Sequence, residues 1–117
     1  MLRYFHYGWE HTILGDTHRL GLGSGLGDGE VGPAYLDELL EPALQAFEAR
    51  IQLHVDKGEL RACNTRFASL NLLSPFLLAM LHQKELLGTN VRPMAVNDFI
   101  KEHVASFLRA YKPENNL

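Results

Sequence analysis

The stretch from Phe67 to Leu87 constrains the fold most, because it carries apolar residues at helical spacing on two faces. One face consists of Phe67, Leu70, Leu77, Leu78 and Leu81, and the other consists of Leu73, Phe76, Met80 and Leu87. A helix that is apolar on both faces needs two packing partners. The next stretch, 94–111, has a single apolar stripe made of Val96, Phe99, Ile100, Val104, Phe107, Leu108 and Tyr111. The surplus apolar surface predicts that these two helices pack against the same two helices of a second copy.

The predicted dimer interface is a four-helix bundle formed by the last two long helices of each copy. Its candidate residues on the first of these helices are Phe67, Leu70, Leu77, Leu78 and Leu81. Those on the second helix are Phe99, His103 and Phe107. We therefore expect a homodimer that buries more than about 1,500 Å² in total. The alternative is an interaction module that recruits another helical protein through the same faces.

Length and charge exclude several classes of function. A chain of 117 residues has the size of one domain with one core. The net charge is −3 with both signs interspersed, so no basic stripe could neutralise several phosphates of DNA. Cys63 is the only cysteine, which excludes an internal disulfide and fits a reducing compartment. Because neither a signal-peptide pattern nor a membrane-spanning apolar run is found, we expect a soluble, cytoplasmic protein.

The first third of the chain differs from the rest. Leu2, Phe5, Trp9 and Ile13 recur at helical spacing, which predicts an aromatic-rich helix over 2–14. Residues 15–32 are so rich in glycine that we predict a mobile loop there, since glycine disfavours helix and strand through backbone entropy. The predicted organisation is therefore one globular unit, with this helix and loop over 1–32 and a helical dimerisation domain over 33–117.

Helix signals follow in the second part of the chain. A helix that Pro33 opens runs to Lys57 with Gly58 as its stop, and Pro42 is expected to kink or divide it. Asn64 or Thr65 can cap the long apolar helix, which Pro75 is expected to bend and Gly88 to close. The last helix opens at Pro93, and the tail from Pro113 is expected to fray. No alternating strand pattern occurs, which predicts an all-α fold.

Chemical motifs are mostly absent. The glycine-rich run 21–26 does not fit G-x-G-x-x-G, and no Lys-Ser or Lys-Thr pair follows it, so a phosphate-binding loop is not expected. His6, Glu10 and His11 cluster on the first helix, which leaves a small metal-binding protein or enzyme as the alternative function. No H-E-x-x-H pattern supports a metal site, and no nucleophile has a recognisable base. We expect no enzyme activity, no metal and no cofactor.

The run from Phe47 to Tyr111 resembles the C-terminal regulatory domain of TetR-family transcriptional regulators. The resemblance rests on the turn Gly58-Glu59-Leu60-Arg61, the long apolar helix closed by Leu87-Gly88, and the run 103–108 near the end. It implies an all-helical domain that dimerises through its last two long helices. It also implies a pocket for a small apolar or aromatic ligand, whose occupancy changes the spacing of two DNA-binding heads in a repressor.

Residues 1–46 do not supply the helix-turn-helix domain with which members of that family begin, and the first third of the chain has no clear counterpart in the family pattern. We therefore expect this chain to lack the DNA-binding head, as a fragment, a truncated product or a free-standing derivative, and to reach DNA only through a domain outside it. The ligand pocket is expected to use aromatic and adaptable residues with one polar handle: Phe5, Tyr7, Trp9, Phe47, Ile51, Asn71, Phe76 and Met80. Plain core packing is the alternative reading of these residues.

Overall fold

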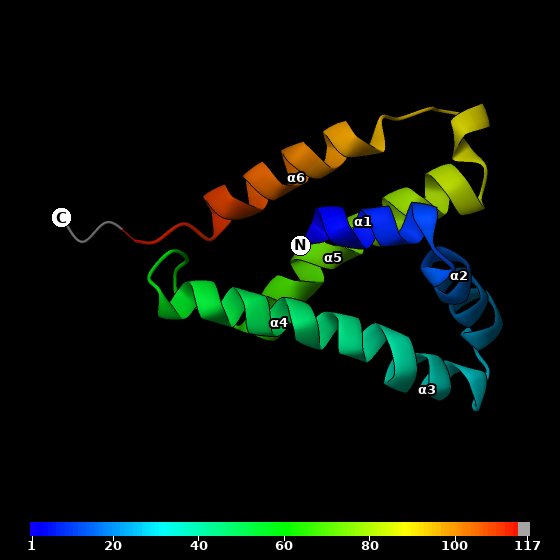
Figure 1. Cartoon of the computed structure of the whole chain (residues 1–117), viewed down its shortest axis with the longest axis horizontal. Helices are drawn as coiled ribbons and strands as arrows, with labels where there is room; N and C mark the ends of the chain where they lie inside the picture. Colours follow the sequence, from blue (N-terminus) through cyan, green and yellow to red (C-terminus); the bar gives the residue numbers. More distant parts are fainter. Residues whose placement is uncertain (115–117) are drawn as a thin grey trace. The chain divides into compact units, whose positions relative to one another are not determined.

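The computed structural model of the chain describes residues 1–114, and within them every regular element is a helix. Figure 1 shows their order along the chain. The elements are α1 (Leu2–His11), α2 (Leu14–Gly25), α3 (Val31–Tyr35), η1 (Leu36–Leu40), α4 (Glu41–Asp56), α5 (Thr65–Met80), η2 (Leu81–Glu85), η3 (Gly88–Asn90) and α6 (Val96–Ala110). The all-α prediction is confirmed. The chain divides into an N-terminal unit, Met1–Leu44, and a C-terminal unit, Gln45–Leu117.

The helix α2 lies where the sequence predicted a mobile loop. That loop prediction was wrong for residues 15–25, because Gly15 and Gly21 are sites of close helix packing. A side chain at Gly15 would overlap the carbonyl oxygen and the indole ring of Trp9, and one at Gly21 would overlap the ring of Tyr35. Packing against the two aromatic rings offsets the poor helix propensity of glycine.

An aromatic cluster around His18 joins the three helices of the N-terminal unit. The imidazole of His18 is stacked on the indole of Trp9 with centroids 5.3 Å apart, and its Nδ1 lies 2.9 Å from the hydroxyl oxygen of Tyr35. Phe5 completes the cluster, 5.5 Å from the His18 ring. Burial lowers the pKa of His18 and raises the pKa of Tyr35 to about 12, because desolvation disfavours the charged form of each.

The chain passes Pro42 without leaving the helical path. The N–H of Glu41 donates to the carbonyl of Leu36, five residues earlier, so η1 is a π-helical turn placed directly before the proline. Proline lacks an N–H and crowds the carbonyl four residues before it, and a wider turn relieves both defects. The predicted break at Pro42 is thus a local π-turn between α3 and α4.

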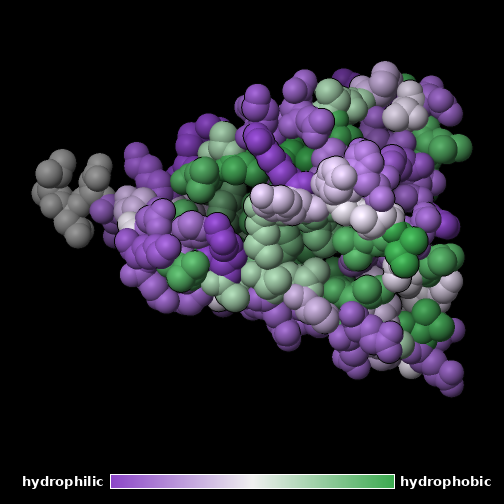
Figure 2. All heavy atoms as spheres, viewed as in Figure 1, coloured by the Kyte–Doolittle hydropathy of each residue, from purple (hydrophilic) through white to green (hydrophobic). Residues whose placement is uncertain are grey.

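The C-terminal unit has its own apolar core. Ile51 of α4, Leu60 of the following turn, Ala68 of α5 and Phe107 of α6 form one buried cluster. Figure 2 shows apolar residues, in green, between the ends of α4 and α6, and hydrophilic residues, in purple, along the outer sides of these helices. Gly58 has a φ of 74°, which ends α4 as the sequence predicted.

The turn that carries the family resemblance also holds the end of α6. The N–H of Arg61 donates to the carbonyl of Tyr111 at 2.9 Å, and its Nε donates to the carbonyl of Ala110 at 3.2 Å. The guanidinium also lies over the Tyr111 ring, 5.1 Å from its centroid. Arg61 therefore satisfies carbonyls that the end of a helix leaves without partners.

The two apolar faces predicted for the stretch 67–87 differ in exposure, and Leu87, which the sequence assigned to the face of Phe76, lies beyond the end of α5 and is 61% exposed. Leu73, Phe76 and Met80 are at most 1% exposed, whereas Phe67 is 65% and Leu78 is 67% exposed. Helical spacing places Phe67 and Leu78 on one side, opposite Phe76. Among residues 1–114 no helix is long and apolar enough to cross a membrane. The predicted fraying of the tail falls partly on residues 115–117, which lie outside the described residues.

Candidate functional site

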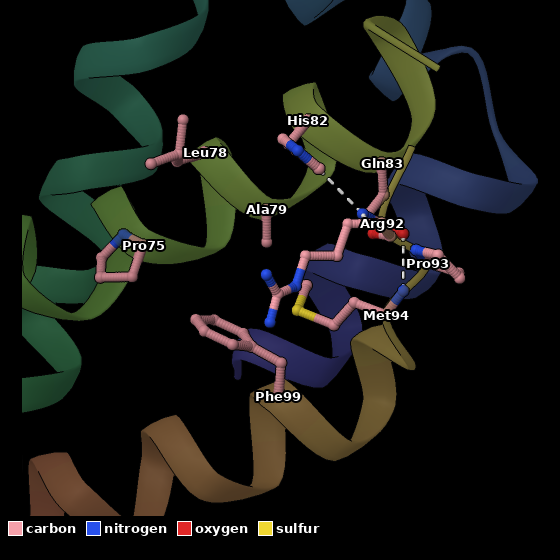
Figure 3. Close-up of a pocket in the computed structure, with 9 residues that line it drawn as sticks. All are labelled: Pro75, Leu78, Ala79, His82, Gln83, Arg92, Pro93, Met94 and Phe99. Carbon is pink, nitrogen blue, oxygen red and sulfur yellow. Dashed lines mark hydrogen bonds between the residues drawn. The ribbon is translucent and has the colours of Figure 1, made fainter. Parts of the chain in front are cut away.

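A pocket of about 550 Å³ lies in the C-terminal unit, between the end of α5, η2, the segment after η3 and the start of α6 (Figure 3). Its size falls within the range of small-molecule sites. The residues that line it are Pro75, Leu78, Ala79, His82, Gln83, Arg92, Pro93, Met94 and Phe99. Most of its wall is apolar, which suits the body of an organic ligand.

Gln83 fastens the segment 92–94 to η2 and so forms one wall of the pocket. The side chain is 3% exposed. Its Nε2 donates to the carbonyl of Arg92 at 2.9 Å, and its Oε1 accepts from the N–H of Met94 at 2.9 Å. Nε2 also lies 2.8 Å from Nδ1 of His82. All polar atoms of this buried amide are thereby engaged within the protein.

The ring of His82 is oriented by two neighbours. Because Nε2 of Gln83 carries only hydrogens, Nδ1 of His82 is assigned as the acceptor, and the ring hydrogen then lies on Nε2. The backbone at Gly88 comes so close that any Cβ there would overlap this ring. The turn that brings Gly88 into position contains Leu87 at a φ of 57°, the one non-glycine residue with positive φ in the described chain. His82 therefore lines the pocket with a ring of fixed orientation, whose Nε2 hydrogen is not used by the contact with Gln83.

Arg92 is the one lysine, arginine or carboxylate residue among those that line the pocket. Figure 3 shows its side chain extending along the pocket, with the guanidinium between Ala79 and Phe99. Its backbone is fixed, since its carbonyl accepts from Gln83 and its N–H donates to Gly88. Within residues 1–114 no carboxylate is paired with the guanidinium. The pocket thus combines an apolar wall with an uncompensated positive charge.

A hydrogen bond beside the pocket joins α5 to α6. Nε2 of His103 donates to the carbonyl of Leu72 at 2.8 Å, in the helical turn that contains Pro75. The His103 ring is also stacked on Phe99, with centroids 5.8 Å apart. Because Phe99 lines the pocket, this contact connects the pocket wall to the α5–α6 pair.

The eight residues predicted for a ligand pocket lie elsewhere than in this pocket. Phe47, Ile51, Phe76 and Met80 are at most 3% exposed. Asn71 is exposed and donates to the hydroxyl of Tyr111. In the N-terminal unit, Trp9 and Phe5 belong to the cluster around His18, and Tyr7 is 64% exposed. The structure therefore does not bring the eight together around this pocket.

Seven of the eight residues predicted for the dimer interface are at least partly accessible. Phe67, Leu70 and Leu78 are exposed, and Leu77, Leu81, Phe99 and His103 are half-buried. Phe107 differs, because it is 7% exposed and packs in the core cluster with Ile51 and Leu60. The sequence grouped it with Phe99, but the helical rotation between them turns Phe107 toward the core cluster.

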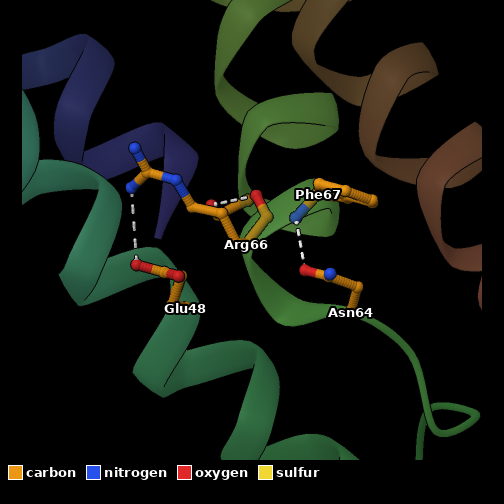
Figure 4. A network of polar contacts seen from close by, with 5 residues as sticks. Glu48, Asn64, Arg66 and Phe67 are labelled. Atoms are coloured by element: carbon orange, nitrogen blue, oxygen red, sulfur yellow. Dashed lines mark hydrogen bonds and ion pairs between the residues drawn. The ribbon is translucent and has the colours of Figure 1, made fainter.

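The start of the exposed face is held by polar contacts on the neighbouring side of α5 (Figure 4). Oδ1 of Asn64 accepts from the N–H of Phe67 at 3.0 Å, so Asn64 is the predicted N-cap. Arg66 is directed toward α4, where it lies 3.7 Å from a carboxylate oxygen of Glu48. The side chain of Phe67 is directed away from α4.

The alternative metal site is not assembled. Nε2 of His6 lies 3.0 Å from Oε1 of Glu10. The ring of His11 lies against that of Tyr7 instead, with centroids 4.4 Å apart. No group of three or more metal-ligating side chains is found within residues 1–114. A second hollow, of about 320 Å³, lies in the N-terminal unit between α2 and α3, and its wall is mainly glycine and leucine without a charged side chain.

Comparison with protein-family models identifies a family for most of the chain. Residues 9–113 match the AefR-like transcriptional repressor, C-terminal domain, which is a TetR-type model. The resemblance seen in the sequence is therefore confirmed, and the match also includes most of the first third of the chain, for which the sequence alone suggested no counterpart. Neither the curated proteins nor the solved structures contain a significant match to the chain.

Proposed function

Because the chain belongs to the family of AefR-like TetR-type repressor C-terminal domains, we propose that it is the ligand-sensing and dimerisation domain of a cytoplasmic transcriptional repressor. Regulatory domains of this family are generally not enzymes. In such a repressor a helix-turn-helix domain reads the operator, and the regulatory domain determines how two copies are arranged.

One observation carries the proposal: the pocket and the exposed apolar face of the C-terminal unit share side chains. Leu78 and Phe99 line the pocket. The same two residues belong to the predicted dimer interface, together with the exposed Phe67. A ligand that contacts Leu78 and Phe99 would therefore change the surface on which a second copy packs.

Because the pocket and the predicted interface share Leu78 and Phe99, a bound ligand would influence how two copies are arranged. Two arrangements of the dimer would place different surfaces over the pocket, and a ligand would favour the arrangement in which it has more contacts. The shift is limited to the difference between the ligand's affinities for the two arrangements. The hydrogen bond from His103 to Leu72 keeps α5 and α6 together while their outer face changes partner.

Sedimentation velocity on the whole chain tests the dimer. We expect a stable dimer at micromolar concentration, and a Glu at Phe67 or Leu78 should produce monomers because each would bury a charge in the interface. Leu108→Glu is the matched control, since Leu108 is 50% exposed on α6 but helical spacing places it opposite Phe99. A wild-type chain that stays monomeric, or a Leu78→Glu chain that stays dimeric, would contradict the proposal.

A further inference from the structure

The ligand pocket of the proposed function has a chemistry that selects its ligand. We propose that it binds a small amphipathic carboxylate, with the carboxylate on the guanidinium of Arg92 and the Nε2 hydrogen of His82, and the apolar body against Leu78, Met94 and Phe99. The inference rests on the proposed function only in that it takes the same pocket as the ligand site.

The polar groups that face the pocket are donors. Gln83 offers nothing to a ligand, because its oxygen accepts from Met94 and its nitrogen is engaged by Arg92 and His82. The Nδ1 of His82 is used by the same contact, so only its Nε2 hydrogen remains. Among the lining residues no carboxylate is present.

The positive charge of Arg92 favours an anion and disfavours a cation. Guanidinium and carboxylate form two parallel hydrogen bonds with matching geometry, and such charge-assisted bonds are stronger than neutral ones. Arg92 is exposed, so solvent partly screens such a pair, and its paired geometry rather than burial favours the carboxylate. A ligand with several phosphates is disfavoured, because the pocket offers one cationic side chain.

The rest of the wall requires an apolar body. Pro75, Leu78 and Ala79 come from α5, while Pro93, Met94 and Phe99 lie on the opposite side. The unbranched thioether of Met94 can adjust to ligands of different shape. A pocket of about 550 Å³ has room for a chain or ring of moderate length beyond the head group.

The test compares octanoate with octanamide, which have the same chain and differ in charge. The chain contains three methionines, so protein labelled with ¹³C at the methionine methyl groups gives few signals, and that of Met94 reports the pocket directly. We expect octanoate to shift the Met94 signal with an affinity about tenfold higher than that of octanamide, as a hydrogen bond to a charged group predicts.

Variants identify the head-group site. Arg92→Gln should reduce the preference for octanoate to about twofold or less, while the contacts from Gln83 to the backbone of residues 92 and 94 remain. Arg109→Gln is the control, because Arg109 bonds to Ser106 on α6 and does not line the pocket. Phe99→Ala should weaken the binding of octanoate and of octanamide equally.

The outcomes separate this inference from the proposed function. Equal affinity for acid and amide at Met94 would overturn the inference and leave the pocket a ligand site. A preference for octanoate that survives Arg92→Gln would also overturn it. If neither compound shifts Met94, both the inference and the sensing part of the proposed function fail, whereas sedimentation still decides dimerisation.

Discussion

The two units reach close helix packing by opposite means. In the N-terminal unit, glycines on α2 leave space into which the rings of Trp9 and Tyr35 fit. In the C-terminal unit, aliphatic and aromatic side chains such as Ile51 and Phe107 fill the space between helices. The first unit also encloses a titratable residue, His18, whereas the core cluster of the second contains none.

The two units are vulnerable to different kinds of substitution. A core filled with large side chains loses stability when a side chain is removed. A core in which glycines leave room for neighbouring rings loses stability when a side chain is added at one of these glycines. Substitutions of each kind therefore distinguish the two modes of packing.

Removing a core ring should damage the C-terminal unit most. We expect Phe107→Ala to lower the free energy of unfolding by about 3–5 kcal/mol, because it leaves a cavity among Ile51, Leu60 and Ala68. The measurement is urea unfolding followed by circular dichroism. Leu108→Ala is the control on the same helix, and it should cost less because Leu108 is 50% exposed. Equal losses for the two variants would show that Phe107 is not a core residue.

Adding a single methyl group should damage the N-terminal unit. We expect Gly15→Ala to cost about 1–3 kcal/mol, because its Cβ would overlap the backbone of Trp9, which cannot move like a flexible side chain. Gly23→Ala on the same helix has nothing within 4 Å and should stabilise by about 0.5–1 kcal/mol. Trp9 fluorescence during urea unfolding reports both, since Trp9 is the only tryptophan. If Gly15→Ala is as stable as Gly23→Ala, α2 does not pack on α1 as described.

Much of the C-terminal unit could be predicted because its signals are local. The stop at Gly58, the cap at Asn64 and the two faces of α5 depend on residues within a few turns of one another. In contrast, α2 could not be predicted from its own sequence. Its glycines disfavour a helix, and the contacts that compensate for this come from residues outside α2. Tyr35 lies far along the chain from the glycine that it covers, so no pattern within residues 15–25 reveals it.

The candidate pocket could not be predicted for a related reason. The sequence predicts that the last helix begins at Pro93, whereas α6 begins at Val96 and Gln83 holds residues 92 and 94 against η2. Nothing in the sequence of residues 91–95 indicates this contact. The contact comes from Gln83, a polar residue within a stretch of apolar periodicity. The predicted pocket used the aromatic residues instead. A buried glutamine that bonds to two backbone positions is recognisable only in three dimensions.

Acidification should affect the two units differently. Burial lowers the pKa of His18 below its ordinary value of 6.5, so the folded state binds this proton more weakly than the unfolded state. The contribution of His18 to stability is therefore complete above pH 6.5 and declines as the pH falls below it. Urea unfolding at several pH values, followed by Trp9 fluorescence, should show this loss. His18→Gln should flatten the pH dependence, and the exposed His11→Gln should not. A slope unchanged by His18→Gln would assign the acid sensitivity to other groups.

The smallest expected effect is a stabilisation by glycine, although glycine usually destabilises a helical protein. Leu87 has a φ of 57° in the turn behind the pocket, a conformation that costs a leucine about 1 kcal/mol and a glycine almost nothing. Because Leu87 is 61% exposed, Leu87→Gly should remove little burial and stabilise the C-terminal unit by roughly 0.5 kcal/mol once the entropy of the unfolded chain is included. Gly58→Ala, at a φ of 74°, provides the opposite change and should destabilise. Circular dichroism during urea unfolding measures both. If Leu87→Gly destabilises instead, the leucine side chain has contacts in solution that offset its backbone strain, and the C-terminal unit relies on large side chains even where its backbone favours glycine.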